Sequence, residues 1–141
     1  MSIKHVIFTS QKAAEAKASW SDWAVISINS TGTSTQLQKG WRDVLSLEFD
    51  DIVEHEESSK LFTEGQARQI IEFVMRCNAS EVEGLIIHCN AGVCRSAAVA
   101  KWVAEKYGLG FPRDYEKHNM HVYRVLNDEN RLIGFYKKPA N

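Results

Sequence analysis

The chain has 141 residues, of which 44% are hydrophobic and 25% are charged, and its 17 basic and 18 acidic residues leave a formal net charge of −1. A chain of this length holds one hydrophobic core, so we expect a single domain over residues 1–141. Because no large field of one sign is present, nucleic acids and anionic membranes are excluded as the main expected partners, and an anion would have to bind at a local site.

The apolar stretches are too short for a membrane span or for the core of a signal peptide. The first of them, residues 6–8, already ends at Thr9. We therefore expect a cytoplasmic protein, and we expect it to be a monomer. The cysteines are an odd number, Cys77, Cys89 and Cys94, which is not the pattern of a secreted disulfide framework.

Hydrophobic periodicity and turn residues divide the chain into alternating strands and helices. Short apolar runs rich in β-branched residues indicate strands, and apolar residues at helical spacing indicate helices. In chain order, the expected elements are a strand at 3–8, a helix at 11–20, a strand at 23–28, a loop at 29–40, a strand at 44–49, a helix after residue 63, a strand at 85–87, a helix at 96–107 and a last helix from 118 or 119 to 126.

Three helix ends carry residues that favour capping. Ser10 precedes the first helix, and Thr63 with Gln66 three residues later has the spacing of a capping box. Gly108 follows the helix at 96–107 as a C-terminal stop.

The alternation of strands and helices predicts an α/β fold. We expect a central, mostly parallel sheet of about four to five strands, flanked by helices and covered on both faces. In such sheets the functional sites lie at the carboxyl ends of the strands.

The most informative stretch is HCNAGVCRS, residues 88–96, which joins the strand at 85–87 to the helix that follows. Successive backbone N–H groups in such a loop can curl around an oxyanion, and Gly92 permits backbone angles that other residues avoid. The helix N-terminus adds a positive dipole end, and the planar guanidinium of Arg95 matches two phosphate oxygens. We call residues 89–96 the cysteine loop. Its expected phosphate-binding residues are Asn90, Ala91, Gly92, Val93, Cys94 and Arg95.

Cys89 is the expected nucleophile of this loop. Among N–H donors, a helix N-terminus and a guanidinium, a cysteine pKa falls from about 8.5 to roughly 3.5–7.5. The thiolate would attack phosphorus and form a phosphocysteine intermediate. Ser96 can donate a hydrogen bond to the sulfur and assist its departure. His88 is expected to bind the loop backbone rather than to transfer protons.

The pattern His-Cys-x5-Arg-Ser resembles the signature of the cysteine-dependent protein tyrosine phosphatase superfamily. The short chain is similar to the dual-specificity-like branch, and the expected elements agree with that fold from about residue 23 to residue 126. The resemblance implies one phosphatase domain that acts on phosphotyrosine, and also on phosphoserine and phosphothreonine, in proteins or in small phosphomonoesters. No metal or other cofactor is expected, because the loop itself supplies the positive charge, and His118 with His121 lacks an evident third ligand.

In this superfamily the general acid is an aspartate on a loop upstream of the cysteine, and the candidates are Asp50 and Asp51. Asp51 is preferred, because Phe-Asp-Asp resembles the acid loops of small family members that use the second aspartate, and Asp50 remains the alternative. No Trp-Pro precedes either aspartate, which departs from the superfamily's best-known acid loop. The polar segment 51–60 is expected to act as a mobile flap.

The second cysteine of the loop, Cys94, leaves two interpretations open. It is either a small buried side chain or a thiol that traps oxidised Cys89 in a reversible, redox-sensitive disulfide. Low-molecular-weight tyrosine phosphatases carry a similar Cys-x4-Cys-Arg-Ser arrangement. Cys77 is expected to be filler at the end of a helix.

The substrate is less well defined by the sequence. Between Cys89 and Arg95 the loop holds no lysine or second arginine, which favours a simple phosphomonoester over a highly charged inositol ring. The expected rim residues are Phe111, Arg113, Tyr115, His118, Asn119, His121, Tyr123 and Arg124. Two other functions remain open, a rhodanese-like sulfurtransferase and a phosphate-binding module without turnover. The second would be indicated by a missing cysteine, arginine or acid, and none is missing.

Overall fold

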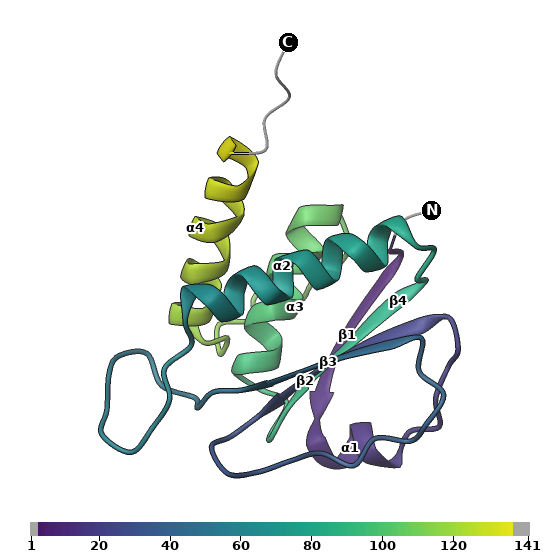
Figure 1. Ribbon diagram of the computed structural model, residues 1–141, viewed down its shortest axis with the longest axis horizontal. Helices are drawn as coiled ribbons and strands as arrows, with labels where there is room; N and C mark the ends of the chain where they lie inside the picture. Colours follow the sequence, from purple (N-terminus) through teal and green to yellow (C-terminus); the bar gives the residue numbers. More distant parts are fainter. Residues whose placement is uncertain (1–2, 137–141) are drawn as a thin grey trace.

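The computed structural model describes residues 3–136, which form a four-stranded parallel sheet and four helices (Figure 1). The elements are β1 (His5–Ser10), α1 (Gln11–Ala16), β2 (Trp23–Asn29), β3 (Asp43–Glu48), α2 (Glu64–Ala79), β4 (Gly84–Cys89), α3 (Arg95–Tyr107) and α4 (Met120–Tyr136). The predicted α/β fold with a central parallel sheet is confirmed. None of the helices described within this range is both long enough and apolar enough to cross a bilayer.

The sheet has the strand order β1-β4-β2-β3, and each described pairing is parallel. The central strands β4 and β2 are buried along their length, except that Trp23 is partly exposed. The edge strands are more exposed, because β1 has only half-buried and exposed positions and Leu47 is the one buried residue of β3. This distribution explains why the central strands are nearly continuous apolar runs in the sequence.

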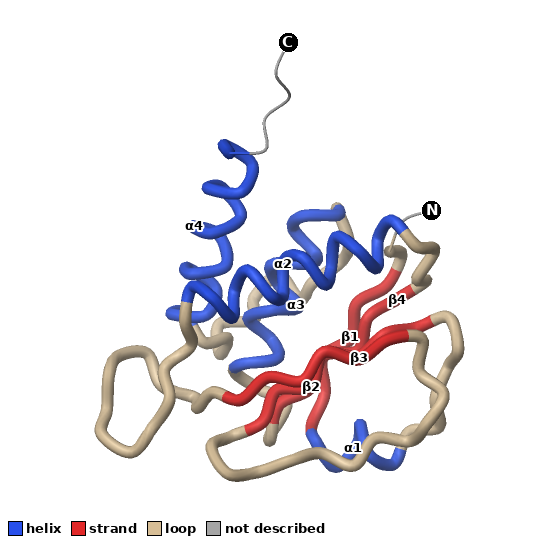
Figure 2. The backbone as a smooth tube through the Cα atoms, in the orientation of Figure 1, coloured by secondary structure: helices blue, strands red, loops and turns tan. Residues whose placement is uncertain are grey.

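The main core lies between the sheet and the helices α2, α3 and α4, which lie on one side of the sheet in Figure 2. Alternate strand residues point into it, because successive side chains of a strand face opposite ways. Ile26 of β2 and Ile87 of β4 meet Val74 of α2, Val99 of α3 and Leu126 of α4 there. The apolar residues that recur at helical spacing in α2, α3 and α4 therefore face the core.

The opposite side of the sheet is covered by less of the chain. The short helix α1 and the loop that follows β2 lie there (Figure 2). The central residues Val25 and Ile86 are fully buried on this side, whereas Ile7 of the edge strand β1 is 42% exposed. Both faces of the central strands are therefore covered, as predicted, but an edge of the smaller face stays open.

Helix α1 is shorter than the sequence predicts. Ser10 caps it as expected, since its Oγ accepts a hydrogen bond from the Ala13 N–H at 3.1 Å. The helix ends at Ala16 because Lys17 takes an extended conformation. The chain then turns back, so that the Trp20 ring packs against Trp23 at the start of β2.

Helix α4 is longer than predicted and continues to Tyr136. Asn119 opens it, as one of the two predicted starting residues, and its Oδ1 accepts a hydrogen bond from the Val122 N–H at 3.0 Å. Farther along, Glu129 is 4% exposed and forms an ion pair with Arg68 of α2 at 2.9 Å. This contact between two distant segments stabilises the additional turns of α4. A pattern of neighbouring residues in the sequence cannot reveal such a contact.

The four strands run in the same direction, so their C-terminal ends meet at one edge of the sheet. The pairings Ser10↔Cys89 and Asn29↔Glu48 lie at this edge. The cysteine loop leaves β4 there, and Phe49, Asp50 and Asp51 leave β3 there. The site is therefore built where parallel sheets carry their sites.

The capping box of α2 gives a test of the fold. The Oγ1 of Thr63 accepts from the Gln66 N–H at 3.1 Å, and the Oε1 of Gln66 accepts from the Thr63 N–H at 3.1 Å. We expect Thr63→Ala to lower the free energy of unfolding by about 1 kcal/mol, measured by urea denaturation followed by circular dichroism. Thr63→Ser keeps the oxygen and should stay within about 0.5 kcal/mol of the wild type. Equal losses in both variants would contradict the role of the hydroxyl group.

Candidate active site

The backbone of the cysteine loop is held in a tight curve by glycine. Gly92 has a φ of +75°, which favours glycine, and a Cβ at this position would lie 2.4 Å from the carbonyl carbon of Thr9. No other residue fits between the loop and the end of β1. On the same side, the Gln11 N–H donates to the carbonyl oxygen of Asn90 at 3.1 Å. The junction of β1 and α1 therefore braces the loop.

The Cys89 side chain lies inside this curve and is 2% exposed. Its Sγ is 3.1 Å from the Oγ of Ser96. Burial alone would raise the pKa of the Cys89 thiol. Hydrogen bonds from the Ser96 hydroxyl and from the backbone N–H groups of Ser96 and Gly92, together with the charge of Arg95, outweigh burial and hold the pKa below its ordinary value. The site therefore favours a thiolate.

His88, the residue before the nucleophile, is fully buried and held at both ring nitrogens. Its Nδ1 lies 3.3 Å from the carbonyl oxygen of Cys89, and its Nε2 lies 2.6 Å from the Oγ of Ser27. Burial lowers the pKa of His88, so the neutral ring is favoured. A carbonyl oxygen can only accept, so Nδ1 carries the proton and Nε2 accepts from Ser27. This arrangement matches the predicted backbone contact and leaves no acceptor or donor for substrate protons.

Arg95 joins the cysteine loop to the ends of two other strands. It is 5% exposed, and its Nη1 donates to the Oγ of Ser30 at 3.0 Å and to the carbonyl oxygen of Phe49 at 2.9 Å. Its Nε is also buried, but no residue within 3–136 accepts a hydrogen bond from it. Buried donors are almost always paired in proteins. The unpaired Nε is therefore a feature of a site for an anion, with the planar guanidinium already fixed in direction.

The structure separates the two candidate aspartates, beginning with Asp50. Its Oδ1 accepts from the Thr31 N–H at 2.9 Å, and its Oδ2 accepts from the Thr31 hydroxyl and from the Lys60 N–H at 2.7 Å. These hydrogen bonds, the Thr31 hydroxyl first, hold the pKa of Asp50 below its ordinary value. A carboxylate held in this way is a brace between loops and a poor proton donor.

Asp51 is in a different setting, with an exposed side chain beside the cysteine loop. The Nδ2 of Asn119 donates to its Oδ1 at 2.8 Å and to the carbonyl oxygen of Ile52 at 3.0 Å. The N–H of Asn119 also donates to the carbonyl oxygen of Cys94 at 2.9 Å. Asn119 thus fixes Asp51 relative to the loop that carries the nucleophile. The sequence placed Asn119 at the rim and at a helix start, and no local signal in it indicates the contact with Asp51.

The other two cysteines differ chemically from Cys89. Burial, followed by a hydrogen bond to Asp51 and the charge of that carboxylate, raises the pKa of Cys94 to about 11. Burial raises the pKa of Cys77 to about 11 as well, and Cys77 lies in the main core. The three thiols are free. A disulfide between Cys89 and Cys94 stays a prediction.

Several residues expected at the rim hold the fold together. The Tyr115 hydroxyl donates to the carbonyl oxygen of Val93 in the cysteine loop. The Nε2 of His121 donates to the carbonyl oxygen of Phe62 at 2.9 Å, and Arg124 donates to the His121 Nδ1 at 3.2 Å. Three others, Phe111, His118 and Tyr123, pack in aromatic pairs. Arg113 is exposed.

The predicted site residues meet at one edge of the sheet. Asn90 and Ala91 are exposed, whereas Arg95 and Ser96 are buried. Between them, Gly92, Val93 and Cys94 are half-buried. Across the described part of the chain, no three His, Cys, Asp or Glu side chains gather where they could hold a metal ion. The arrangement is suited to binding a phosphoryl group and attacking it with sulfur.

Comparison with known proteins supports the same fold. No protein-family model matches the sequence, and no match to it was found among curated proteins. Human DUSP28 is similar in structure, with a TM-score of 0.63 and 14% identity over 94% of this chain and 95% of DUSP28.

Two further solved structures have the same fold. The human tyrosine phosphatase-like serine/threonine/tyrosine-interacting protein has a TM-score of 0.52 and 17% identity, over 78% of this chain and 77% of that protein. PTPMT1 in complex with PI(5)P has a TM-score of 0.53 and 17% identity, over 80% of this chain and 79% of that protein. The chain therefore has the fold of the dual-specificity and protein tyrosine phosphatases, as the cysteine loop predicted.

The contrast between the thiols predicts a distinct titration. We expect one thiolate to form at a pH below 9.0, the ordinary pKa of cysteine, and we assign it to Cys89. The rise in ultraviolet absorbance that accompanies formation of this thiolate should be missing in Cys89→Ser. In Ser96→Ala the rise should occur at higher pH, because the hydrogen bond from the Ser96 hydroxyl to the sulfur is lost. Cys94→Ser is the matched control and should keep the early transition. A wild-type curve without any transition below 9.0 would contradict the assignment.

The setting of Asp50 predicts a pH-dependent contribution to stability. Its folded pKa is depressed, so its hydrogen bonds stabilise the fold fully above the ordinary value of 3.8 and lose that effect as the pH falls through the lowered pKa. We expect Asp50→Asn to cost about 1–2 kcal/mol at neutral pH in urea denaturation, and less as the pH drops. Asp51→Asn, at an exposed carboxylate, should cost less at neutral pH. A loss for Asp50→Asn that does not vary with pH would contradict this account.

Proposed function

We propose that this protein hydrolyses phosphomonoesters on phosphotyrosine-containing proteins, and also on phosphoserine and phosphothreonine, through a phosphocysteine intermediate. One observation carries the proposal. The Cys89 thiol, with a lowered pKa, lies among the N–H groups of Gly92 and Ser96, in the same loop as Arg95, whose buried Nε has no acceptor. A nucleophile and an oxyanion site are thereby combined in a single loop.

In the first step, the Cys89 thiolate attacks phosphorus. A bond forms between sulfur and phosphorus while the bond between phosphorus and the substrate oxygen breaks. Asp51 in its acid form gives its proton to that departing oxygen. Arg95 binds the oxygens of the transferred group, and its attachment to Ser30 and Phe49 fixes it before the substrate arrives.

In the second step, the Asp51 carboxylate takes a proton from water, and the water oxygen attacks phosphorus. The bond between sulfur and phosphorus breaks and releases inorganic phosphate. The Cys89 thiolate that leaves is stabilised by the Ser96 hydroxyl at 3.1 Å. Asp51 ends in its acid form, ready for the next substrate.

The fold alone is compatible with hydrolysis and with binding. One similar structure is PTPMT1 with PI(5)P, and another is an interacting protein described as phosphatase-like. The contact between Asn119 and Asp51 favours hydrolysis here, because a module that only binds phosphate has no need of a carboxyl group positioned beside the cysteine loop.

The proposal is tested by hydrolysis of p-nitrophenyl phosphate. We expect turnover in the wild type, inhibition by vanadate, and no turnover in Cys89→Ser. Asp51→Asn should lower kcat by about 100-fold or more for aryl phosphates with poor leaving groups, and far less for those with good ones.

Asp50→Asn is the matched control and should keep the wild-type dependence on the leaving group. A reversal between Asp50 and Asp51 would transfer the acid role to Asp50. Phosphate-analogue binding without turnover would indicate a binding module. Sulfur transfer from thiosulfate, unaffected by Asp51→Asn, would indicate a rhodanese-like enzyme.

A further inference from the structure

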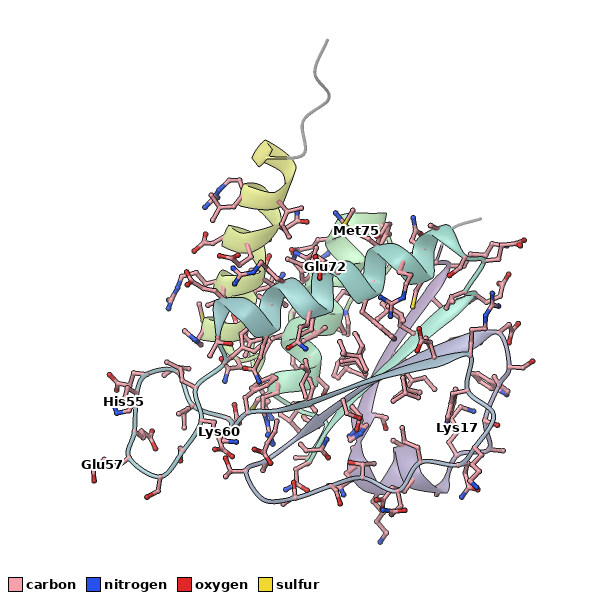
Figure 3. The ribbon with its side chains drawn as sticks, in the orientation of Figure 1. Lys17, His55, Glu57, Lys60, Glu72 and Met75 are labelled. Atoms are coloured by element: carbon pink, nitrogen blue, oxygen red, sulfur yellow. The ribbon has the colours of Figure 1, made fainter. Side chains whose placement is uncertain are left out.

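The loop that follows the candidate acid is strongly acidic. We call residues 51–59 the acidic loop. It carries the exposed side chains of Glu54, Glu56 and Glu57, and none of these three forms an ion pair with another residue in the described range 3–136. Figure 3 shows His55 and Glu57 on its outer part, away from the rest of the chain. Lys60 does not neutralise it, because its ammonium group pairs with Glu48.

The base of the acidic loop is fixed beside the cysteine loop. The Asp50 N–H donates to the carbonyl oxygen of Lys60 at 2.7 Å, and the Lys60 N–H donates to the Asp50 carboxylate at 2.7 Å. These two bonds close the loop at its neck. Asn119 holds its first two residues, as described above. The glutamates are therefore presented from an anchored base, and the mobility of the segment 51–60 stays a prediction.

A separate observation indicates where an anion would bind relative to this loop. Arg95 is 5% exposed, and its buried Nε has no hydrogen-bond acceptor among the described residues. A bound anion would supply that acceptor. The same guanidinium donates to the carbonyl oxygen of Phe49, two residues before the acidic loop begins. A phosphate bound at Arg95 thus brings the residues that flank it in a substrate close to the glutamates.

We propose that the acidic loop selects phosphopeptides with lysine or arginine close to the phosphorylated residue. This proposal rests on the proposed function, because it concerns the substrates of the same site. Three unpaired carboxylates attract cations over about 8–10 Å at physiological salt and repel further anions over the same range. Peptides with acidic flanks and polyphosphorylated headgroups are disfavoured for the same reason.

The test compares two phosphotyrosine peptides of equal length, one with basic and one with acidic flanking residues. We expect kcat/KM of the wild type to be about 5-fold higher for the basic peptide. The variant Glu54→Gln/Glu56→Gln/Glu57→Gln should lose most of this preference and keep its activity on p-nitrophenyl phosphate. Higher salt should reduce the wild-type preference.

The matched control removes three negative charges elsewhere, through Asp22→Asn/Glu72→Gln/Glu81→Gln. These side chains are exposed, and Figure 3 shows Glu72 on α2, far from the acidic loop. Asp22 and Glu81 precede β2 and β4, at the opposite edge of the sheet from the cysteine loop. The control should keep the wild-type preference, which separates the acidic loop from net charge.

A measurement of peptide binding tests this inference without any dependence on turnover. Affinities of Cys89→Ser for the two peptides are measured by fluorescence anisotropy, with and without the three glutamine substitutions. A preference for the basic peptide that disappears with the glutamates supports the inference even if the wild type hydrolyses nothing, in which case the proposed function fails alone. Equal affinity for both peptides, or tighter binding of a short-chain PI(5)P than of the basic peptide, would overturn it.

Discussion

The guanidinium of Arg95 is the group on which the candidate site depends. It begins α3, yet it bonds to Ser30 after β2 and to the carbonyl oxygen of Phe49 after β3. The ends of β2 and β3 are thus tied to one side chain, which is nearly buried and whose buried Nε has no acceptor among the described residues. Burial of a charge is costly unless hydrogen bonds compensate, so its surroundings fix its direction tightly. That direction determines where an anion would meet the guanidinium, at the edge of the sheet where Cys89 also lies.

The cysteine loop also shows how strongly local partners control the chemistry of a thiol. Cys89 and Cys94 are five residues apart in sequence. Cys89 meets N–H and O–H donors, which stabilise negative charge on sulfur and lower its pKa. Burial raises the pKa of Cys94, and the Asp51 carboxylate beside it raises that pKa further because it disfavours a second negative charge. One loop therefore holds a thiol whose pKa is lowered and another whose pKa is raised, and their different neighbours account for the contrast.

Much of the fold could be predicted because its signals are local. Ser10, the pair Thr63 and Gln66, and the strand cores are recognised within a few residues, and the cysteine loop is a contiguous pattern. The choice between Asp50 and Asp51 could not be made in this way. The two residues are adjacent in sequence, and they are separated by Thr31 on one side and Asn119 on the other, which only the fold brings near. The length of α4 depended on a similar distant contact, the ion pair between Glu129 and Arg68.

The attachment of Asp51 to the start of α4 divides the site between two parts of the chain that can open separately. The nucleophile and its anion site belong to β4 and α3, deep in the sheet, whereas the candidate acid is held from α4, an outer helix. Outer helices open more readily than central strands. A partial opening at α4 would free the candidate acid while the sulfur kept its setting, and both steps of the proposed cycle would then slow together although the anion site stayed intact.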